Sequence, residues 1–356
     1  MPKTIQFPKT PRGNDPADHV DDHKYESQVR NLVENKTDEL GWLEDFTVTD
    51  EEAEQISDPV FIIPHLIVSG HIVLVAAEPN GGKTTIFFHF AGEMVKSGQR
   101  VIYVNADTSA GDAKSFIVKA KQLGIELLLP DMKLGKSMDD VVANMEGMNN
   151  RSVDLNGFVF VFDTLKKMTD VINKGAAKKL FKTLRGLSAK GATIILLAHT
   201  NKYSDAEGKP IYEGTGDMRS DVDELLYLIP EKHSDGSMTV SVEPDKTRAR
   251  IEKMTFKISP ERLVTREDSF VDVSAKRAYK KQREADQDAI ERIVEAITDK
   301  HIKQTDIVNY CKNASISSRK STACLKRYSK GDDRLWNSQK GMQHNSTYYS
   351  LVEIGV

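Results

Sequence analysis

The sequence predicts an α/β fold: a parallel sheet with helices on both faces, followed by a small C-terminal domain of helices and a β-hairpin. Near-continuous apolar runs alternate with helical patterns, which is typical of strands buried on both faces. A glycine-rich turn follows the first run, and helix-spaced apolar residues resume after residue 285. The strands are expected at 73–76, 101–104, 158–162 and 193–198, and the helices at 85–96, 110–123, 138–145 and 176–190.

The overall composition limits the classes of function. A length of 356 residues corresponds to about two domains. The formal net charge of -3 gives no argument for nucleic-acid binding by the whole protein, so such an argument has to come from local clusters. Cys311 and Cys324 fit neither a disulfide framework nor a zinc site, which favours reduced thiols. Because the sequence starts without a secretion signal and has no membrane-length apolar run, we expect a cytoplasmic protein with no membrane segment.

Residues 1–55 are expected to form a flexible N-terminal arm. Residues 1–24 are polar and almost without apolar periodicity, as in disordered tails. A short amphipathic helix is expected within 25–42, where apolar residues recur at helical spacing. The arm either docks on a neighbouring subunit or is a loosely ordered leader, and the sequence leaves both open.

The strongest functional motif follows the first strand. It fits the phosphate-binding pattern G-x-x-x-x-G-K-[ST], with Ala77 in place of the first glycine. Gly81 and Gly82 allow backbone N–H groups to point inward. Lys83 reaches the β- and γ-phosphates, and the Thr84 hydroxyl can ligate Mg²⁺. The sequence therefore predicts a site for a nucleoside triphosphate, ATP, with Mg²⁺, formed by Glu78, Pro79, Asn80, Gly81, Gly82, Lys83, Thr84 and Thr85.

Three further strands end in polar residues, where ligands of parallel sheets bind. Asp163 follows the strand at 158–162 and is expected to hold Mg²⁺ together with Thr84. Asp107 follows the strand at 101–104 and either activates the attacking water or belongs to the cap of the next helix. His199 ends the strand at 193–198 and either contacts the γ-phosphate or is an ordinary structural histidine.

The segment after His199 is expected to contain a mobile polar loop and a hairpin. The loop covers 203–217, and a strand follows at 223–228. The hairpin pairs 238–242 with 254–258, and alternation of apolar residues predicts that the second strand is a half-buried edge strand. Lys246 and Arg248 project from its turn, either as functional cations or as a solvated charge run.

In this order, these motifs resemble the RecA-like ATPase core of hexameric helicases, most of all the DnaB and plasmid RepA group. The resemblance covers about residues 60–260. It implies a homo-oligomeric ring, a hexamer in this family, with ATP at each interface and single-stranded DNA in the channel. The residues to which it assigns catalytic roles are Lys83, Asp107, Asp163, His199, Lys246 and Arg248.

The resemblance also implies a role for each residue. Asp107 stands where the family has a catalytic Glu, and His199 stands at the sensor position. Lys246 and Arg248 match a Lys-x-Arg pair that reaches into the neighbour's site as an arginine finger. The channel loops after Asp163 and His199 carry the residues expected to bind single-stranded DNA, Lys166, Lys167 and Lys202. The sequence departs from the family pattern at two positions. Asp107 replaces a Glu, which shortens the side chain, and Ala77 replaces the first Gly of the phosphate loop.

The remaining chain predicts a second domain. We expect an ATPase domain over 56–265, a basic linker or exposed helix over 266–285, and a winged helix over 286–356. The first helix of the winged helix is expected at 286–300. The second begins after a Thr305-Asp306 cap, and the third, at 319–328, follows a Ser317-Ser318 cap and precedes a hairpin. Both cysteines are expected in the core of this domain. The third helix carries the candidates for duplex contact, Arg319, Lys320, Lys326 and Arg327. The domain binds either duplex origin DNA or a replication protein.

These expectations combine into an ATP-hydrolysing DNA helicase of a plasmid, phage or other mobile element. Two alternatives remain open. One is a non-translocating ATP-dependent DNA-binding regulator or loader of replication, and the other is a RecA-like recombination mediator.

Overall fold

The computed structural model describes residues 41–54, 60–132, 134–204, 210–214, 216–331, 333–341 and 346–352. The chain divides into two units, Met1–Asp58 and Pro59–Val356. The first unit contains a 3-10 helix, η1 (Gly41–Phe46), and a short helix, α2 (Asp50–Glu54). The amphipathic helix predicted within 25–42 lies outside the described residues, apart from its last two positions.

A mixed sheet forms the centre of the second unit. Within the described residues it contains ten strands, in the order β12-β11-β10-β9-β3-β7-β6-β4-β5 with β8 paired to β7. The parallel strands are β9 (Glu224–Lys232), β3 (Ile72–Ala77), β7 (Thr193–Ser204), β6 (Phe158–Asp163), β4 (Arg100–Asn105) and β5 (Glu126–Leu128). The antiparallel strands are β10 (Met238–Lys246), β11 (Met254–Ile258), β12 (Val264–Arg266) and β8 (Pro210–Tyr212); a separate pair is formed by β1 (Phe61–Ile63) and β2 (Ile67–Val68).

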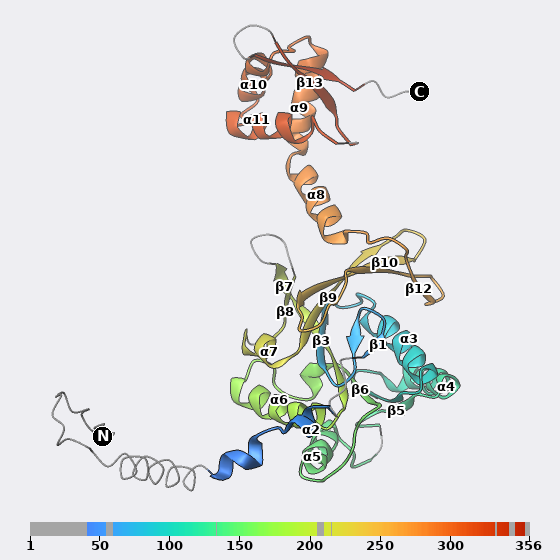
Figure 1. The fold of residues 1–356 in the computed structure, drawn as a ribbon. Helices are drawn as coiled ribbons and strands as arrows, with labels where there is room; N and C mark the ends of the chain where they lie inside the picture. The colour runs from blue at the N-terminus through green and yellow to red at the C-terminus, as the bar shows by residue number, and fades with distance from the viewer. Residues whose placement is uncertain are drawn as a thin grey trace, which may run out of the picture. The chain divides into compact units, whose positions relative to one another are not determined.

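Helices cover both faces of this sheet, as the sequence predicts (Figure 1). One face packs against α3 (Lys83–Lys96) and α4 (Ala110–Leu123), and the other against α5 (Met138–Asn149) and α6 (Lys174–Ser188). Successive residues of β3 alternate between the two cores and all six are buried. This double burial explains why its sequence is a continuous apolar run without period-two alternation.

The strand order brings the carboxyl ends of β3, β7, β6 and β4 to one edge of the sheet. Two other strands, β7 and β6, lie between β3 and β4 in the sheet, although β4 follows β3 in the chain. A crevice therefore opens between the loops that follow β3 and β4. Such crevices are the usual ligand sites of parallel sheets. The polar strand ends in the sequence therefore converge.

One local prediction around the sheet is wrong in part, and another is wrong. The loop predicted over 203–217 is partly regular, because β7 continues to Ser204 and β8 and α7 (Gly216–Asp221) follow. The strand at 254–258 is not at the edge, because β12 pairs with its outer side. Thr255 is buried together with the apolar residues, so β11 is covered on both faces.

The C-terminal part contains a helix, α8 (Val273–Ala285), and then three helices and a β-hairpin. These are α9 (Gln287–Thr298), α10 (Gln304–Asn313), α11 (Ser318–Arg327), β13 (Trp336–Lys340) and β14 (Thr347–Leu351). Both cysteines are free and buried in its core, and Ser317 caps α11 by accepting from the Lys320 N–H at 3.2 Å, as predicted. The predicted Thr305-Asp306 cap is wrong, because α10 begins earlier, after Lys303.

None of the helices in the described ranges is long and apolar enough to cross a bilayer.

Candidate active site

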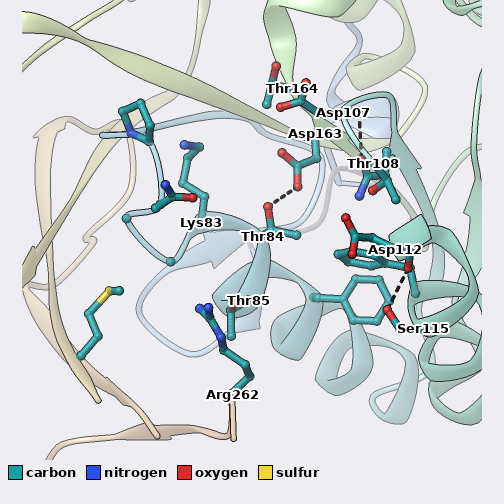
Figure 2. A pocket seen from close by; sticks show the side chains of 18 of the residues that line it. Lys83, Thr84, Thr85, Asp107, Thr108, Asp112, Ser115, Asp163, Thr164 and Arg262 are labelled. Carbon is teal, nitrogen blue, oxygen red and sulfur yellow. Dashed lines mark hydrogen bonds between the residues drawn. The ribbon is translucent and has the colours of Figure 1, made fainter. Parts of the chain in front are cut away.

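A cleft of about 1060 Å³ opens at the carboxyl edge of the sheet. It is lined by the phosphate loop, the ends of β4, β6 and β7, the start of α4, and the turns after β9 and β11 (Figure 2). The volume is at the upper end of the range for small-molecule sites and accommodates a nucleoside triphosphate. The predicted nucleotide residues from Pro79 to Thr85 line it, and Glu78 lies outside this lining.

The phosphate loop has a geometry that only glycine permits at two positions. Gly82 has φ 86°, and a Cβ there would approach Ile258 Cδ1 to 2.7 Å. A Cβ on Gly81 would approach the Glu78 carbonyl oxygen to 2.8 Å. The backbone therefore packs closely against β11, and α3 begins at Lys83 with no side-chain cap on its first N–H groups. Free donors at a helix N-terminus suit an anionic ligand.

Lys83 is a buried cation, 6% exposed, at the centre of the cleft. Its Nζ donates to the Ala77 carbonyl oxygen at 3.3 Å and lies 3.2 Å from His199 Nδ1. Burial lowers the pKa of Lys83. Burial, and then the Lys83 cation, lower the pKa of His199, so the neutral imidazole accepts from the ammonium. Within the described part of the chain, no carboxylate forms an ion pair with Lys83, which leaves its charge for a phosphate.

Asp163, at the end of β6, is joined to the loop as predicted. Thr84 Oγ1 donates to Asp163 Oδ2 at 2.6 Å, and the Tyr103 hydroxyl donates to the same oxygen at 3.0 Å. Burial raises the pKa of Asp163, and these two hydrogen bonds partly offset the rise. A hydroxyl and a carboxylate oxygen side by side fit Mg²⁺, which prefers oxygen ligands. Tyr103 was not predicted, and its signal in the sequence is a lone hydroxyl within the apolar run of β4.

Asp107 is exposed and lies at the cleft near Asp163 (Figure 2). The cap of α4 is Ser109, which accepts from the Asp112 N–H at 3.4 Å, so the cap interpretation is wrong for Asp107 itself. The Asp107 N–H donates to Asn105 Oδ1 at 3.0 Å, which fixes the backbone after β4. Its carboxylate is therefore left facing the cleft.

Two of the lysines predicted to bind single-stranded DNA lie beside this site. Lys167 Nζ is 4.0 Å from Asp107 Oδ1. The Lys166 cation adds to the lowering of the pKa of both Lys83 and His199. The side chain of the third, Lys202, lies outside the described residues.

The cleft contains residues that no motif in the sequence marked. Thr164 is 4% exposed, and its hydroxyl has no hydrogen-bond partner among the described residues. Arg262 enters from the turn after β11 with φ 66° and lies near Thr85 in Figure 2. His233 and Ser237 come from the turn between β9 and β10. Thr164 directly follows the parallel strand β6, whereas Arg262, His233 and Ser237 reach the cleft through the antiparallel extension of the sheet, which local sequence patterns do not position.

Lys246 and Arg248 lie at the opposite edge of the sheet from the phosphate loop. Lys246 pairs with Leu225 at the start of β9, whereas the loop follows the other end of β3. Lys246 Nζ donates to three carbonyls at the end of α7, at 2.8, 3.0 and 2.7 Å. Arg248 pairs with the buried Asp223 at 2.9 Å. The structure therefore does not bring these two cations into the chain's own cleft.

The basic residues of α11 fall into two groups. Lys320 Nζ lies 2.5 Å from Asp288, and Arg327 pairs with the buried Asp286. Arg319 and Lys326 are exposed. Two of the four predicted duplex contacts are thus engaged within the domain.

Comparison with known proteins supports a RecA-like core. No protein-family profile matches the chain. It is 21% identical over 168 residues to the DNA repair protein RadA of Brucella abortus (strain 2308), and 23% identical over 174 residues to RadA of Bacillus subtilis (strain 168). The matches cover 45% and 47% of this chain and 34% of each relative, so the chain spans about a third of the length of these relatives.

Among solved structures, the flagellar accessory protein FlaH from Methanocaldococcus jannaschii matches with 14% identity and a TM-score of 0.41, over 58% of this chain and 93% of FlaH. The similarities are distant and extend to no particular helicase family. The chain has an α/β core with a mostly parallel, RecA-like sheet, and it is distantly similar to RadA over less than half of its length.

Proposed function

We propose that this chain hydrolyses ATP as a homo-oligomer and uses the reaction to move along single-stranded DNA as a helicase. The observation that carries the proposal is the convergence of Lys83, the Thr84–Asp163 pair and Asp107 on one cleft. These are the groups that phosphoryl transfer to water requires: a cation for the phosphates, oxygen ligands for Mg²⁺ and a carboxylate for the water.

In the proposed reaction, the loop N–H groups and Lys83 hold the β- and γ-phosphates. Mg²⁺ held by Thr84 and Asp163 would neutralise phosphate charge. Asp107 accepts a proton from the attacking water while the oxygen of that water bonds to the γ-phosphorus. The bond between the γ-phosphorus and the β–γ bridging oxygen breaks, which gives ADP and phosphate. His199, 3.2 Å from Lys83, is placed to respond when the γ-phosphate leaves.

The oligomer is proposed from the position of the Lys-x-Arg pair. Lys246 and Arg248 lie away from their own cleft, and Arg248 is more than half exposed, so a neighbouring subunit can meet it. There Arg248 would neutralise charge on the γ-phosphoryl group, which elsewhere accelerates hydrolysis about 10³–10⁵-fold. Lys246 would first have to leave the three carbonyls to which it donates. We propose a ring, a hexamer by resemblance, with ATP at each interface.

A mixing experiment tests this arrangement. Arg248→Ala subunits keep an intact cleft, and Lys83→Ala subunits keep an intact Arg248. Each variant alone is expected to be inactive, and mixtures are expected to recover part of the ATPase activity at interfaces that combine both intact halves. Lack of recovery at every ratio would argue against action between subunits.

The C-terminal helices and hairpin have the element order of a winged helix, and we propose that they bind duplex DNA at an origin or dock a replication protein. Arg319 and Lys326 are the exposed candidates on α11. Lys166, Lys167 and Lys202 remain candidates for the single strand, with Lys167 also close to Asp107.

Unwinding of a forked duplex tests the helicase proposal. Wild-type protein is expected to displace the strand only with ATP, and Lys83→Ala is expected to displace none. ATPase activity that DNA stimulates, without unwinding of any fork, would replace this proposal with the non-translocating regulator. The similarity to RadA, named a DNA repair protein, favours a recombination mediator as the second candidate, for which strand exchange is the assay.

A further inference from the structure

The helix that leads to the C-terminal domain is anchored on the sheet of the core. Val273, at the start of α8, is fully buried in one of the two cores of that sheet. Ser274 Oγ donates to Glu243 Oε1 of β10 at 2.7 Å. The segment expected as a basic linker or exposed helix is therefore a helix over 273–285, and its first turn is fixed to the core.

One turn along, Arg277 contacts the phosphate loop directly. Its guanidinium donates to both oxygens of Glu78, at 3.2 and 3.1 Å, and also to the Pro230 carbonyl oxygen at the end of β9. Glu78 is the first residue after β3, and its own carbonyl oxygen accepts from the Gly81 N–H at 3.1 Å. A two-bond contact of this kind fixes orientation as well as distance.

The pair has an electrostatic consequence for an anionic ligand. The Glu78 carboxylate is close enough to Lys83 to act on its pKa. Alone, this negative charge would oppose a triphosphate in the same loop. Arg277 neutralises it while holding the loop against β9.

We propose that Arg277 is a positioning residue of the phosphate loop, and that its pair with Glu78 couples nucleotide binding to the docking of α8. The inference rests on nucleotide binding at this loop, as proposed above. Because coupling between two equilibria is reciprocal, any factor by which docked α8 raises nucleotide affinity is also the factor by which nucleotide favours docked α8.

The far end of α8 is joined to the C-terminal helices. Asp286 ends α8 and precedes α9; it is buried and accepts from the Tyr328 hydroxyl at 3.0 Å and from Arg327. The Tyr279 ring of α8 lies edge-on to Tyr328, with centroids 6.2 Å apart. The state of the phosphate loop is thereby linked through one helix to the domain that we propose binds DNA or a partner.

Binding of a fluorescent, non-hydrolysable ATP analogue to the full chain tests the affinity. Arg277→Ala is expected to weaken binding about two- to fivefold, the range of a partly exposed ion pair. Glu78→Gln removes the opposing charge, so Arg277→Ala in that background is expected to add no further loss. Arg277→Lys, which keeps the charge but not the two-bond geometry, is expected to be intermediate. The matched control is Lys281→Ala, an exposed cation of the same helix, with unchanged binding.

Hydrogen exchange measures the reciprocal effect, which a merely structural role would not produce. In the wild type, the analogue is expected to slow amide exchange in α8 by about the same factor as Arg277→Ala weakens binding. In Glu78→Gln, the analogue is expected to leave this exchange unchanged. The coupling would be overturned if Arg277→Ala lowered nucleotide affinity equally in the wild-type and Glu78→Gln backgrounds. It would also be overturned if amide exchange in α8 did not change when nucleotide binds. Failure of the wild type itself to bind the analogue would instead overturn the proposed function.

Discussion

Replacing Tyr103 by Phe tests the metal-holding part of the proposed site through a residue that does not line the cleft. The Tyr103 hydroxyl donates to Asp163 Oδ2 at 3.0 Å, and both residues are buried. The Tyr103 ring packs edge-on against Phe88, with centroids 5.2 Å apart. Because phenylalanine keeps this ring, the substitution removes the hydroxyl alone.

The expected size of the effect follows from this geometry. A hydrogen bond to a charged group contributes about 1.5–3 kcal/mol. Loss of an outer partner of a metal ligand lowers metal affinity about 10–100-fold, or about 1.4–2.7 kcal/mol, so the two ranges agree. We expect Tyr103→Phe to raise the Mg²⁺ concentration for half-maximal ATPase activity about 10–100-fold, and saturating Mg²⁺ to restore most of kcat, because Thr84 still donates to Asp163.

The pH dependence has a definite sign. Burial raises the pKa of Asp163 and the Tyr103 hydrogen bond lowers it, so loss of the hydroxyl raises it further. Since the ionised carboxylate binds Mg²⁺, the acid limb of the pH–activity profile is expected to move to higher pH in Tyr103→Phe. Mg²⁺ titrations of the ATPase at several pH values measure both effects. The control is Tyr349→Phe, which loses a hydroxyl that donates to Gln304 at 3.5 Å in the C-terminal domain. An unchanged Mg²⁺ requirement in Tyr103→Phe would refute the reasoning.

Three further predictions concern other residues. Asp107→Asn is expected to slow single-turnover hydrolysis about 10²–10⁴-fold, as loss of a general base does, while nucleotide affinity stays near that of the wild type. Asp163→Asn is expected to stabilise the nucleotide-free protein by about 1–2 kcal/mol in urea unfolding at neutral pH. Burial raises the pKa of Asp163, so its ionised form is the unfavourable one; the gain is present above that pKa and disappears in acid, where the wild-type carboxyl is protonated. Arg319→Ala with Lys326→Ala is expected to reduce the salt-dependence slope of duplex binding by about 2, and an unchanged slope indicates protein docking.

The parts of the fold that the sequence predicts are those with local physical causes. The run at β3 is apolar because both of its faces are buried, and Gly82 is required by a positive φ and a close contact. Helix α4 spans the residues that its pattern predicts, because Ser109 caps its start and Gly124, with φ 73°, ends it. Asp163 was predictable because a parallel strand delivers its next residue to the ligand edge.

The parts that the sequence does not predict depend on contacts between distant segments. Arg277 reaches Glu78 across 199 positions of the chain. Lys246 donates to two carbonyls of α7 and to that of Val222, just after the helix, although the sequence shows only a charge run. In each case the residue type is visible in the sequence, whereas its partner is decided by packing of the whole sheet.

The β9–β10 hairpin connects the two halves of the proposed site. Each strand has nine residues, so the hairpin spans about 30 Å and crosses the whole sheet. Its turn, with His233 and Ser237, lines the chain's own cleft, and its open end carries Lys246. Seven of the nine residues of β9 are buried, and β10 pairs with β9 along most of its length, so the two strands are expected to shift together, since packed cores do not deform continuously. In the proposed oligomer, a displacement of the turn by the chain's own nucleotide would therefore move the cations presented to the neighbour, and neighbouring sites would be coupled without any further element.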